Sequence, residues 1–509
     1  PREFLDSSED DEDSTKGYLI VGDVWNPEED LDSLPDSWFK TLKSGRKLDS
    51  NKEAFIPKCI YFDEYGNCST SRPMKYQGWF MPAPLPFDPT SGTFYDRQTR
   101  DGTKLAKLGS EGRSTSTTIT TFSILTQLRE SNYKLQDQKL LSFTDNRQDA
   151  ALQAGHFNDF VSVVQLRSGV YHALRQAPNN RLTYTSLGEA VFRALSLPFT
   201  DYSTFDKVPE LPSVREKYER CFQDFLLYRA IEDLRRSWRI ILPNLEQCAL
   251  LDIEYDNIRE VADAHKIWMG VPVLEVLDNQ KRLEFLNTVI DFFRLEYALH
   301  SKNYLESSII KEHELAFREQ LRAPWTLDDR ETIALPKVIR LDALANKTSL
   351  ASSSMGPQSG LGKFIKQFVK SEGIDPSILR GDSYRDFILT LMEKLVDADY
   401  LVRIPAKGKD GKEVHTFRLK IDKIIWKLGD GVTVKPDVIK RRSFRDVTIK
   451  PNAFFSSMYR NEFSRHKRLR AEDHTGQLDK DSRLDREDRF RCEWWLNDSK
   501  KLGPDHERI

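Results

Sequence analysis

The sequence predicts an α/β protein in which a long, mostly helical stretch separates two sheet-forming parts. The stretch "LLSFTDNRQDAALQAGHF" (residues 140–157) is an apolar run followed at once by a helical pattern, which is typical of a strand-to-helix turn. Between about residues 158 and 320, apolar side chains recur at helical spacing. Residues 363–435 have the pattern of helices followed by a β-hairpin.

Composition indicates a soluble globular chain, with 39% hydrophobic and 31% charged residues among 509. This length is enough for roughly three or four domains. The formal net charge of −2 does not indicate a polyanion-binding protein as a whole. The charge is uneven, however, because residues 1–33 are strongly acidic and residues 436–470 are strongly basic. Such asymmetry favours a basic face, or else an ordinary solvated surface.

The five cysteines include no C-x-x-C pair, which argues against a zinc ribbon and against a disulfide framework. No apolar run is long enough to cross a bilayer, and the acidic N-terminus is unlike a signal peptide. We therefore predict a cytoplasmic location, no membrane partner and no metal. The chain opens without methionine, and we expect it to be an excerpt of a longer protein.

The expected segments follow from these patterns. The predicted order is a disordered acidic segment (1–16), an irregular β-rich segment (17–105), a first sheet-forming part (106–160), a helical insertion (161–350), a linker (351–362), a helix–hairpin unit (363–435) and a second sheet-forming part (436–509). Within the first sheet-forming part, we expect a helix that begins near residues 114–118 and a strand over Lys139–Phe143.

The turn after that strand carries the first candidate site. Asp145 is a good N-cap and Gln148 completes a capping box, so the helix is expected to start at Asn146. Arg147 would project from the first turn, with Thr144 at the carboxyl edge of the sheet. Helix N-termini at such an edge suit a phosphate, and an arginine adds charge-assisted bonds. The alternative is a plain turn with Arg147 paired to a neighbouring aspartate.

Residues 363–435 carry the second candidate site. A short helix, a turn at "DPSIL", a helix over "YRDFILTLMEKLVDA" and then a hairpin are in the order of a winged helix. Lys407, Lys409 and Lys412 crowd the hairpin tip. A basic wing is a common contact to duplex nucleic acid. The alternative is an exposed edge that lysines protect from aggregation.

Several stretches also resemble a known family. "KLLSFTDNRQDAALQAGHFNDF" is similar to motif IV of superfamily 2 DEAD/DEAH-box helicases, especially the large bacterial, defence- or repair-related type with a C-terminal cysteine-rich domain. "RAEDHTGQLDKDSRLDREDRF" (residues 470–490) resembles a later segment of that family. "LGSEGRSTSTTITT" and "VWNPEEDLDSLPDSWF" also match, in the family's order. Where relatives often carry C-x-x-C, this chain has Asp88 and Ser91, which are not usual zinc ligands.

The resemblance implies that residues 106–160 and 436–509 are two parts of the second RecA-like motor domain, with residues 17–105 linking the motor domains. It implies contacts from Thr144, Asn146 and Arg147, and from Thr475 and the amide of Gly476, to the backbone of a single strand. Such contacts position a strand without reading its sequence. His474 is either part of this turn or an ordinary loop histidine.

The implied function is part of an ATP-dependent helicase or translocase, with DNA favoured over RNA and no catalytic residue in this chain. The sequence contains no G-x-x-x-x-G-K-[ST] loop, and motifs V and VI of the family are also absent. The resemblance therefore implies that ATP and Mg²⁺ bind only the complete protein, which would supply these motifs. We therefore expect no ATP hydrolysis by this chain alone. The alternative is a non-catalytic nucleic-acid-binding scaffold that uses the winged-helix-like unit.

Overall fold

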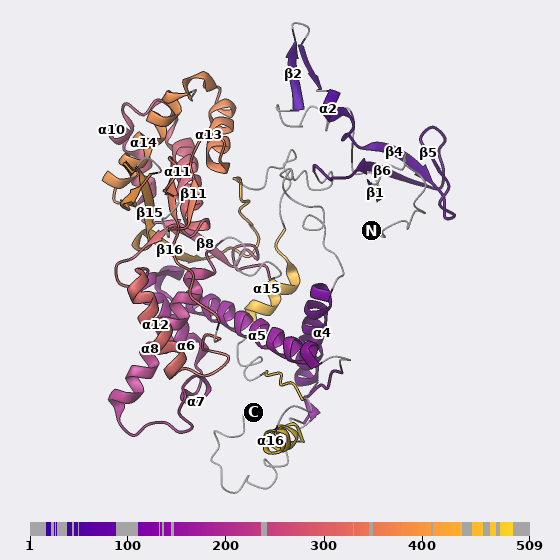
Figure 1. Ribbon diagram of the computed structural model, residues 1–509, viewed down its shortest axis with the longest axis vertical. Helices are drawn as coiled ribbons and strands as arrows, with labels where there is room; N and C mark the ends of the chain where they lie inside the picture. Colours follow the sequence, from indigo (N-terminus) through magenta and orange to yellow (C-terminus); the bar gives the residue numbers. More distant parts are fainter. Residues whose placement is uncertain are drawn as a thin grey trace. The chain divides into compact units, whose positions relative to one another are not determined.

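The computed structural model shows a mixed α/β protein with several separate sheets (Figure 1). It describes residues 17–21, 25, 27, 38–42, 45–48, 50–87, 110–131, 133–134, 137–143, 147–235, 242–328, 330–345, 350–379, 381–408, 411–439, 450–461, 469–474 and 479–491. The chain forms two compact units, unit 1 (residues 1–109 and 436–449) and unit 2 (residues 110–435 and 450–509). Within the described residues, no helix is both long enough and apolar enough to pass through a bilayer.

Unit 1 is built on an antiparallel sheet with an aromatic core. The sheet has the order β1 (Gly17–Val21), β6 (Tyr76–Pro82), β4 (Lys58–Phe62) and β5 (Cys68–Ser69). A hairpin of β2 (Phe39–Leu42) and β3 (Gly45–Leu48) precedes the short helix α2 (Ser50–Glu53). The buried core consists of Trp25, Trp38, Trp79, Met81, Leu85 and Phe87. These aromatics bury much area per residue, which suits a small sheet.

Unit 2 begins with two long helices, α4 (Ser110–Glu130) and α5 (Arg147–Gln176). Helix α4 starts before the expected residues 114–118. The predicted strand over Lys139–Phe143 is wrong, because these residues lie in no strand and the Phe143 side chain is 86% exposed. A strand needs a hydrogen-bonding neighbour, and none pairs with this run among the described residues.

A three-stranded antiparallel sheet forms the next layer of unit 2. Its order is β7 (Arg181–Thr183), β16 (Ile424–Leu428) and β8 (Leu251–Tyr255). Helices α6 (Tyr184–Leu195) and α8 (Pro212–Glu232) pack beside α5 and each other. Gly188 permits the close approach of α6 and α8, because a Cβ there would meet the Gln223 carbonyl oxygen at 2.5 Å.

A second sheet of unit 2 has the order β11 (Ser352–Ser354), β10 (Val338–Arg340), β15 (Thr416–Lys420) and β12 (Leu401–Arg403), with β9 (Leu299–His300) also pairing with β15. The expectation of a linker at 351–362 is wrong here: β11 runs parallel to β10, and Met355 after it is fully buried. Backbone hydrogen bonds hold this edge strand in place, so its serines need no apolar side chain to form it.

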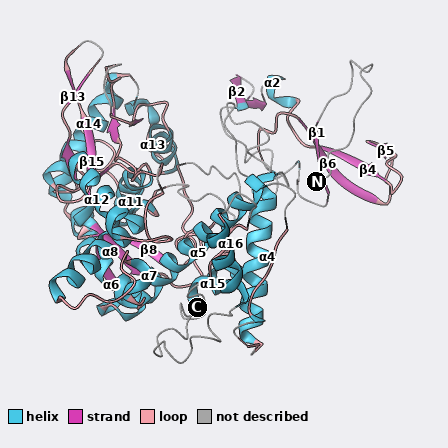
Figure 2. Ribbon diagram, turned by 60° about the horizontal axis from the view of Figure 1, so that its bottom comes forward, coloured by secondary structure: helices cyan, strands magenta, loops and turns pink. Residues whose placement is uncertain are grey.

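The helices and hairpin expected over residues 363–435 are present. They are α13 (Gly360–Ser371), the 3-10 turn η4 (Pro376–Leu379), α14 (Asp382–Asp397) and the antiparallel pair β12–β15. Strands β13 (Ala406–Lys407) and β14 (Glu413–Val414) extend the hairpin (Figure 2). The returning strand β15 ends at Lys420, where η5 (Ile421–Lys423) interrupts it, and β16 joins the sheet of β7 and β8.

The remaining elements complete the helical cover of unit 2. They are η3 (Pro178–Asn180), α7 (Phe199–Tyr202), α9 (Ile258–Asp263), α10 (His265–Trp268), α11 (Asn279–Leu295), α12 (Ser307–Gln320), α15 (Ala453–Arg460) and α16 (Lys480–Arg491). Helix α15 lies against α5 in both ribbon views (Figure 2). The chain therefore returns to α5 after strand β16.

Candidate nucleic-acid interface

The strand-to-helix turn is described only from its helical side. Thr144, Asp145 and Asn146 lie outside the described residues, and α5 begins at Arg147, whose side chain also lies outside them. Gln148 is exposed on the first turn of α5. The helix expected after the turn is therefore present, and the phosphate contacts of this turn stay a prediction.

The segment that precedes the candidate residues Thr475 and Gly476 lies directly on α5. Thr475 and Gly476 are outside the described residues, but residues 469–474 are described. The side-chain amide of Asn158 donates to the Ala471 carbonyl oxygen at 2.9 Å, and the Ala471 amide donates to Asn158 Oδ1 at 2.8 Å. This pair joins residues 313 positions apart, so the two segments that resemble helicase motifs meet in one unit.

A second contact joins the same regions. Lys139 Nζ donates to the Phe490 carbonyl oxygen at 2.8 Å and lies 4.8 Å from the centre of the Phe490 ring. Lys139 precedes the turn at the start of α5, and Phe490 lies near the end of α16. Two independent contacts therefore connect the region around α5 to the region around His474.

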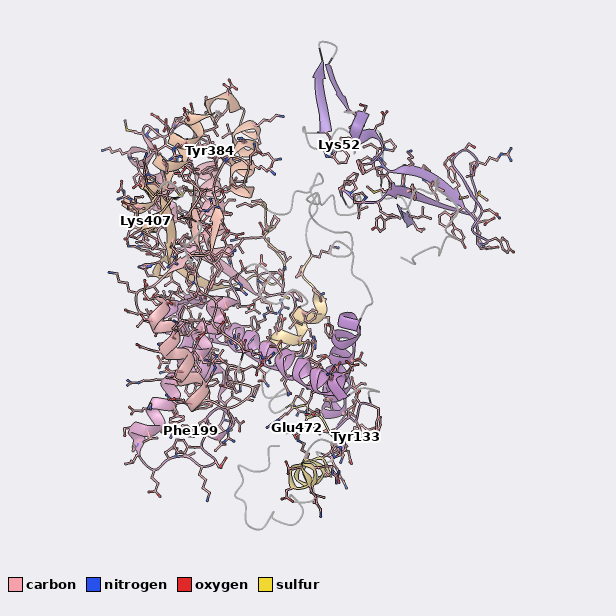
Figure 3. The ribbon with its side chains drawn as sticks, viewed as in Figure 1. Lys52, Tyr133, Phe199, Tyr384, Lys407 and Glu472 are labelled. Atoms are coloured by element: carbon pink, nitrogen blue, oxygen red, sulfur yellow. The ribbon has the colours of Figure 1, made fainter. Side chains whose placement is uncertain are left out.

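Polar contacts hold α16 to the residues that precede it. His474 Nε2 is 3.0 Å from Glu487 Oε1, and Arg486 Nη1 is 3.0 Å from an Asp473 carboxylate oxygen. The carboxylate of Glu472, labelled in Figure 3, is 3.6 Å from Arg486 Nε. A phosphate would compete with these carboxylates for Arg486, because a guanidinium binds both kinds of anion.

Helix α4 is fastened to α5 by polar contacts. Thr118 is fully buried, and its hydroxyl is 3.0 Å from His156 Nδ1 and accepts from the Gln153 amide at 3.2 Å. The rings of Phe122 and Phe160 pack edge to face beside them, 5.4 Å apart. The "RSTSTT" stretch singled out in the sequence therefore supplies an internal contact between helices, at least through Thr118.

Lys407 and Lys412 of the hairpin lie near both basic and acidic side chains. Lys407 is opposite Glu413 in the β13–β14 ladder, Lys412 is exposed and Lys409 lies outside the described residues. The neighbouring helix α14 presents Asp382 and Asp386 to solvent. Acidic side chains there oppose a DNA phosphate backbone by like-charge repulsion. Lys407 also lies at the opposite side of unit 2 from Glu472 (Figure 3), so the hairpin and the α5 region are separate surfaces.

No metal centre emerges from the part of the chain that the structure describes, where no three His, Cys, Asp or Glu side chains form a metal-binding group. Cys59 and Cys68 are both free thiols. Asp88 and Ser91 lie outside the described residues. The sequence contains no phosphate-cradling loop of the P-loop type.

Sequence reasoning did not foresee the Arg167 cluster that joins α15 and the end of α8 to α5. Arg167 is almost fully buried, forms two bonds with Asp233 and donates to the Tyr459 hydroxyl at 2.9 Å. An arginine on the apolar face of a predicted helix was the available signal, because a buried charge requires a partner. Its partners could not be named, since they lie far away in the chain.

Comparisons with protein-family models, with curated proteins and with solved structures found no match.

Proposed function

We propose that the chain is part of an ATP-dependent DNA helicase or translocase and contributes single-strand backbone contacts of its second motor domain. The observation that carries the proposal is the double hydrogen bond between Asn158 and Ala471. It joins the segment that resembles motif IV to the segment that contains His474, across the large insertion. A single RecA-like domain built from residues 106–160 and 436–509 requires such a junction.

In this proposal the first turn of α5 supplies amide groups and Arg147 to the strand, with Thr144 and Asn146 beside them. Thr475 and the Gly476 amide hold the next phosphates. Cytoplasmic DNA would be the partner. ATP and Mg²⁺ would drive movement in the complete protein.

The test compares salt-dependent binding of a fluorescent oligothymidine strand to the native chain and to Arg147→Ala, by anisotropy. Loss of one phosphate contact lowers affinity and reduces the slope of log K against log salt by about one unit. Arg175→Ala is the matched control, because Arg175 is exposed at the other end of α5. We expect it to leave both affinity and slope unchanged. Equal slopes for all three proteins would refute the role of Arg147.

The second candidate function is a nucleic-acid-binding scaffold that uses the winged-helix-like unit. It is favoured by the order of α13, α14 and the β12–β15 hairpin, and opposed by the acidic outward face of α14. If it were correct, duplex DNA would bind better than single strands, and the double change Lys407→Glu, Lys412→Glu would weaken duplex binding. The motor proposal expects the single strand to be preferred and this double variant to bind it normally.

A further inference from the structure

Strand β1 lies at an open edge of the unit 1 sheet. The strand order is β1, β6, β4 and β5, so β6 is the neighbour of β1 on one side. No described strand lies along its other side. All the contacts proposed above for DNA lie in unit 2. The β1 edge is therefore independent of the proposed function.

The register of the ladder shows which backbone groups of β1 point outward. Gly17 lies opposite Pro82 of β6. Alternate residue pairs of an antiparallel ladder exchange both N–H···O=C bonds, and Pro82 has no N–H with which to do so. The bonds to β6 therefore come from the even-numbered residues of β1. The N–H and C=O groups of Gly17, Leu19 and Val21 point away from the sheet.

This edge carries none of the features by which proteins protect an edge strand. Strand β1 reads GYLIV, with no charged residue and no proline, and its register with β6 has no bulge. Natural edge strands are usually protected by such features, because a row of outward N–H and C=O groups is a template for another strand. An unprotected edge is typical of a site for β-strand addition.

The side chains along the edge differ in how far they protrude. Ile20 packs against the buried core of unit 1, so Leu19 and Val21 lie on the opposite face of the sheet. Leu19 is 40% exposed and Val21 is 61% exposed. The ring of Phe80 lies over Gly17, where a Cβ atom would collide with it. The edge therefore has a protruding side chain at one end and none at the other.

These features make the edge complementary to itself. If two copies of β1 lie antiparallel across a twofold axis at Leu19, then Leu19 lies opposite its counterpart and Gly17 lies opposite Val21 of the other copy. Every outward N–H and C=O group of these three residues then has a partner. The protruding Val21 side chain also lies beside the residue that has no side chain.

Charge favours the antiparallel direction over the parallel one. The residues that precede Gly17 include seven Asp or Glu, against Arg2 and Lys16. Parallel pairing of two β1 strands would bring two such acidic segments to the same end, which like-charge repulsion disfavours. Antiparallel pairing directs them to opposite ends of the joined strands.

We propose that unit 1 binds a second copy of this chain through β1, so that two four-stranded sheets join edge to edge. The backbone hydrogen bonds supply the affinity, as in other cases of strand addition. The contacts of Leu19 with its counterpart, and of Gly17 with Val21, fix the register. The product is a symmetric dimer in which both copies use the same surface.

The first experiment is sedimentation velocity of the native chain, without nucleic acid, over a wide range of protein concentration. We expect a shift, as concentration rises, from the 59.1 kDa monomer to a species of twice that mass. A chain that stays monomeric would overturn the proposal. A series of ever larger species would overturn it too, because a twofold contact closes at two copies.

Leu19→Lys and Leu19→Glu then test the contact at the twofold axis. Each variant places two like charges directly opposite one another, which destabilises a strand pair. We expect each to raise the dimer dissociation constant at least about tenfold. An equimolar mixture of the two variants pairs opposite charges at this position and is expected to restore the dimer. Variants that dimerise like the native chain, or a mixture that stays monomeric, would contradict the proposed contact.

Val21→Pro tests the backbone without adding a charge. The N–H of Val21 makes no bond to β6, and proline is tolerated in an edge strand whose N–H faces outward. The variant should therefore keep the native circular dichroism spectrum, whereas the dimer dissociation constant should rise at least about tenfold. A folded Val21→Pro chain that dimerises as tightly as the native chain would show that the outward backbone groups are not used.

Tyr76→Lys is the matched control. Tyr76 is also 40% exposed and lies on the same face as Leu19, but it belongs to β6, which lies between β1 and β4. Edge-to-edge pairing leaves this face uncovered, so we expect Tyr76→Lys to dimerise like the native chain. If it lost the dimer as Leu19→Lys does, the two copies would be stacking through the face of the sheet, and edge pairing would be wrong.

Discussion

Arg167 shows how one buried charge can organise a large unit. Its guanidinium bonds to both carboxylate oxygens of Asp233 at 2.7 and 3.0 Å, to the Tyr459 hydroxyl, and to the carbonyl oxygens of Leu242 and Pro243. Burial alone would lower the pKa of Arg167, but the charge of Asp233 outweighs it and holds the pKa above its ordinary value. Burial also raises the pKa of Tyr459 to about 12, so its hydroxyl remains neutral and donates to Pro243.

Removing this guanidinium should strongly destabilise unit 2. We expect Arg167→Ala to lower the free energy of unfolding of unit 2 by about 3–5 kcal/mol, because it leaves the Asp233 charge largely buried without its partner. Urea unfolding followed by circular dichroism measures the change. Arg175→Ala, on the exposed end of the same helix, should change stability by less than about 0.5 kcal/mol. A loss below about 1 kcal/mol for Arg167→Ala would show that the cluster is not a stabilising junction.

At the scale of elements, the Ser/Gly-rich run 351–360 shows how backbone geometry can outweigh composition. Ser359 caps α13 by accepting from the Gly362 amide at 3.0 Å. A Cβ at Gly362 would collide with the Gly356 carbonyl oxygen and with Pro357. The absence of a side chain at Gly362 therefore allows Gly356 and Pro357 to pack against the start of α13, which a flexible tether would not require.

This packing predicts a specific sensitivity. Gly362→Ala should destabilise unit 2 by roughly 1–3 kcal/mol through overpacking, although alanine is the better helix former. Differential scanning calorimetry of the two proteins measures the loss. Gln367→Ala, at an exposed position of the same helix, should be neutral or slightly stabilising. If Gly362→Ala were also stabilising, the run before α13 would not be packed as the structure shows.

At the scale of the whole molecule, the chain closes on itself over a long sequence distance. Helix α5 is contacted by Tyr459 of α15, through Arg167, and by Ala471, through Asn158. Closing so long a loop is entropically unfavourable. Several contacts together offset this loss of entropy, including the hydrogen bond from Ser456 Oγ to the Cys248 carbonyl oxygen. The region proposed to hold a DNA strand depends on this closure.

Asn158→Ala should loosen the junction without unfolding the unit. We expect faster amide hydrogen exchange in residues 469–474, measured by mass spectrometry, because both bonds to Ala471 are lost. Single-strand binding should weaken in parallel if the two segments hold one strand. Gln176→Ala removes an exposed amide from the end of α5 and serves as control. Unchanged exchange in residues 469–474 would mean that Asn158 does not hold this segment.

The pattern of apolar residues predicted the helices of unit 2 and the α13–α14–hairpin order, because helix formation depends on neighbours three and four positions away. The prediction was wrong at Lys139–Phe143, where an apolar run lies outside any strand. It was also wrong at 351–362, where three serines form the strand β11 in place of the expected linker. A strand is defined by a partner that local sequence does not specify. For the same reason the sequence could show Arg167 as an unusual charge on an apolar helix face, but it could not identify Asp233 and Tyr459 as its partners.

The sequence by itself determined the α/β class, most helices and the resemblance between two distant segments and helicase motifs. Only the tertiary structure decided that these segments meet through Asn158 and Ala471, and that Lys407 of the hairpin lies opposite Glu413. Periodicity acts along the chain over a few residues. Pairing, burial and charge neutralisation act in space, between residues whose separation in the chain carries no information about their distance.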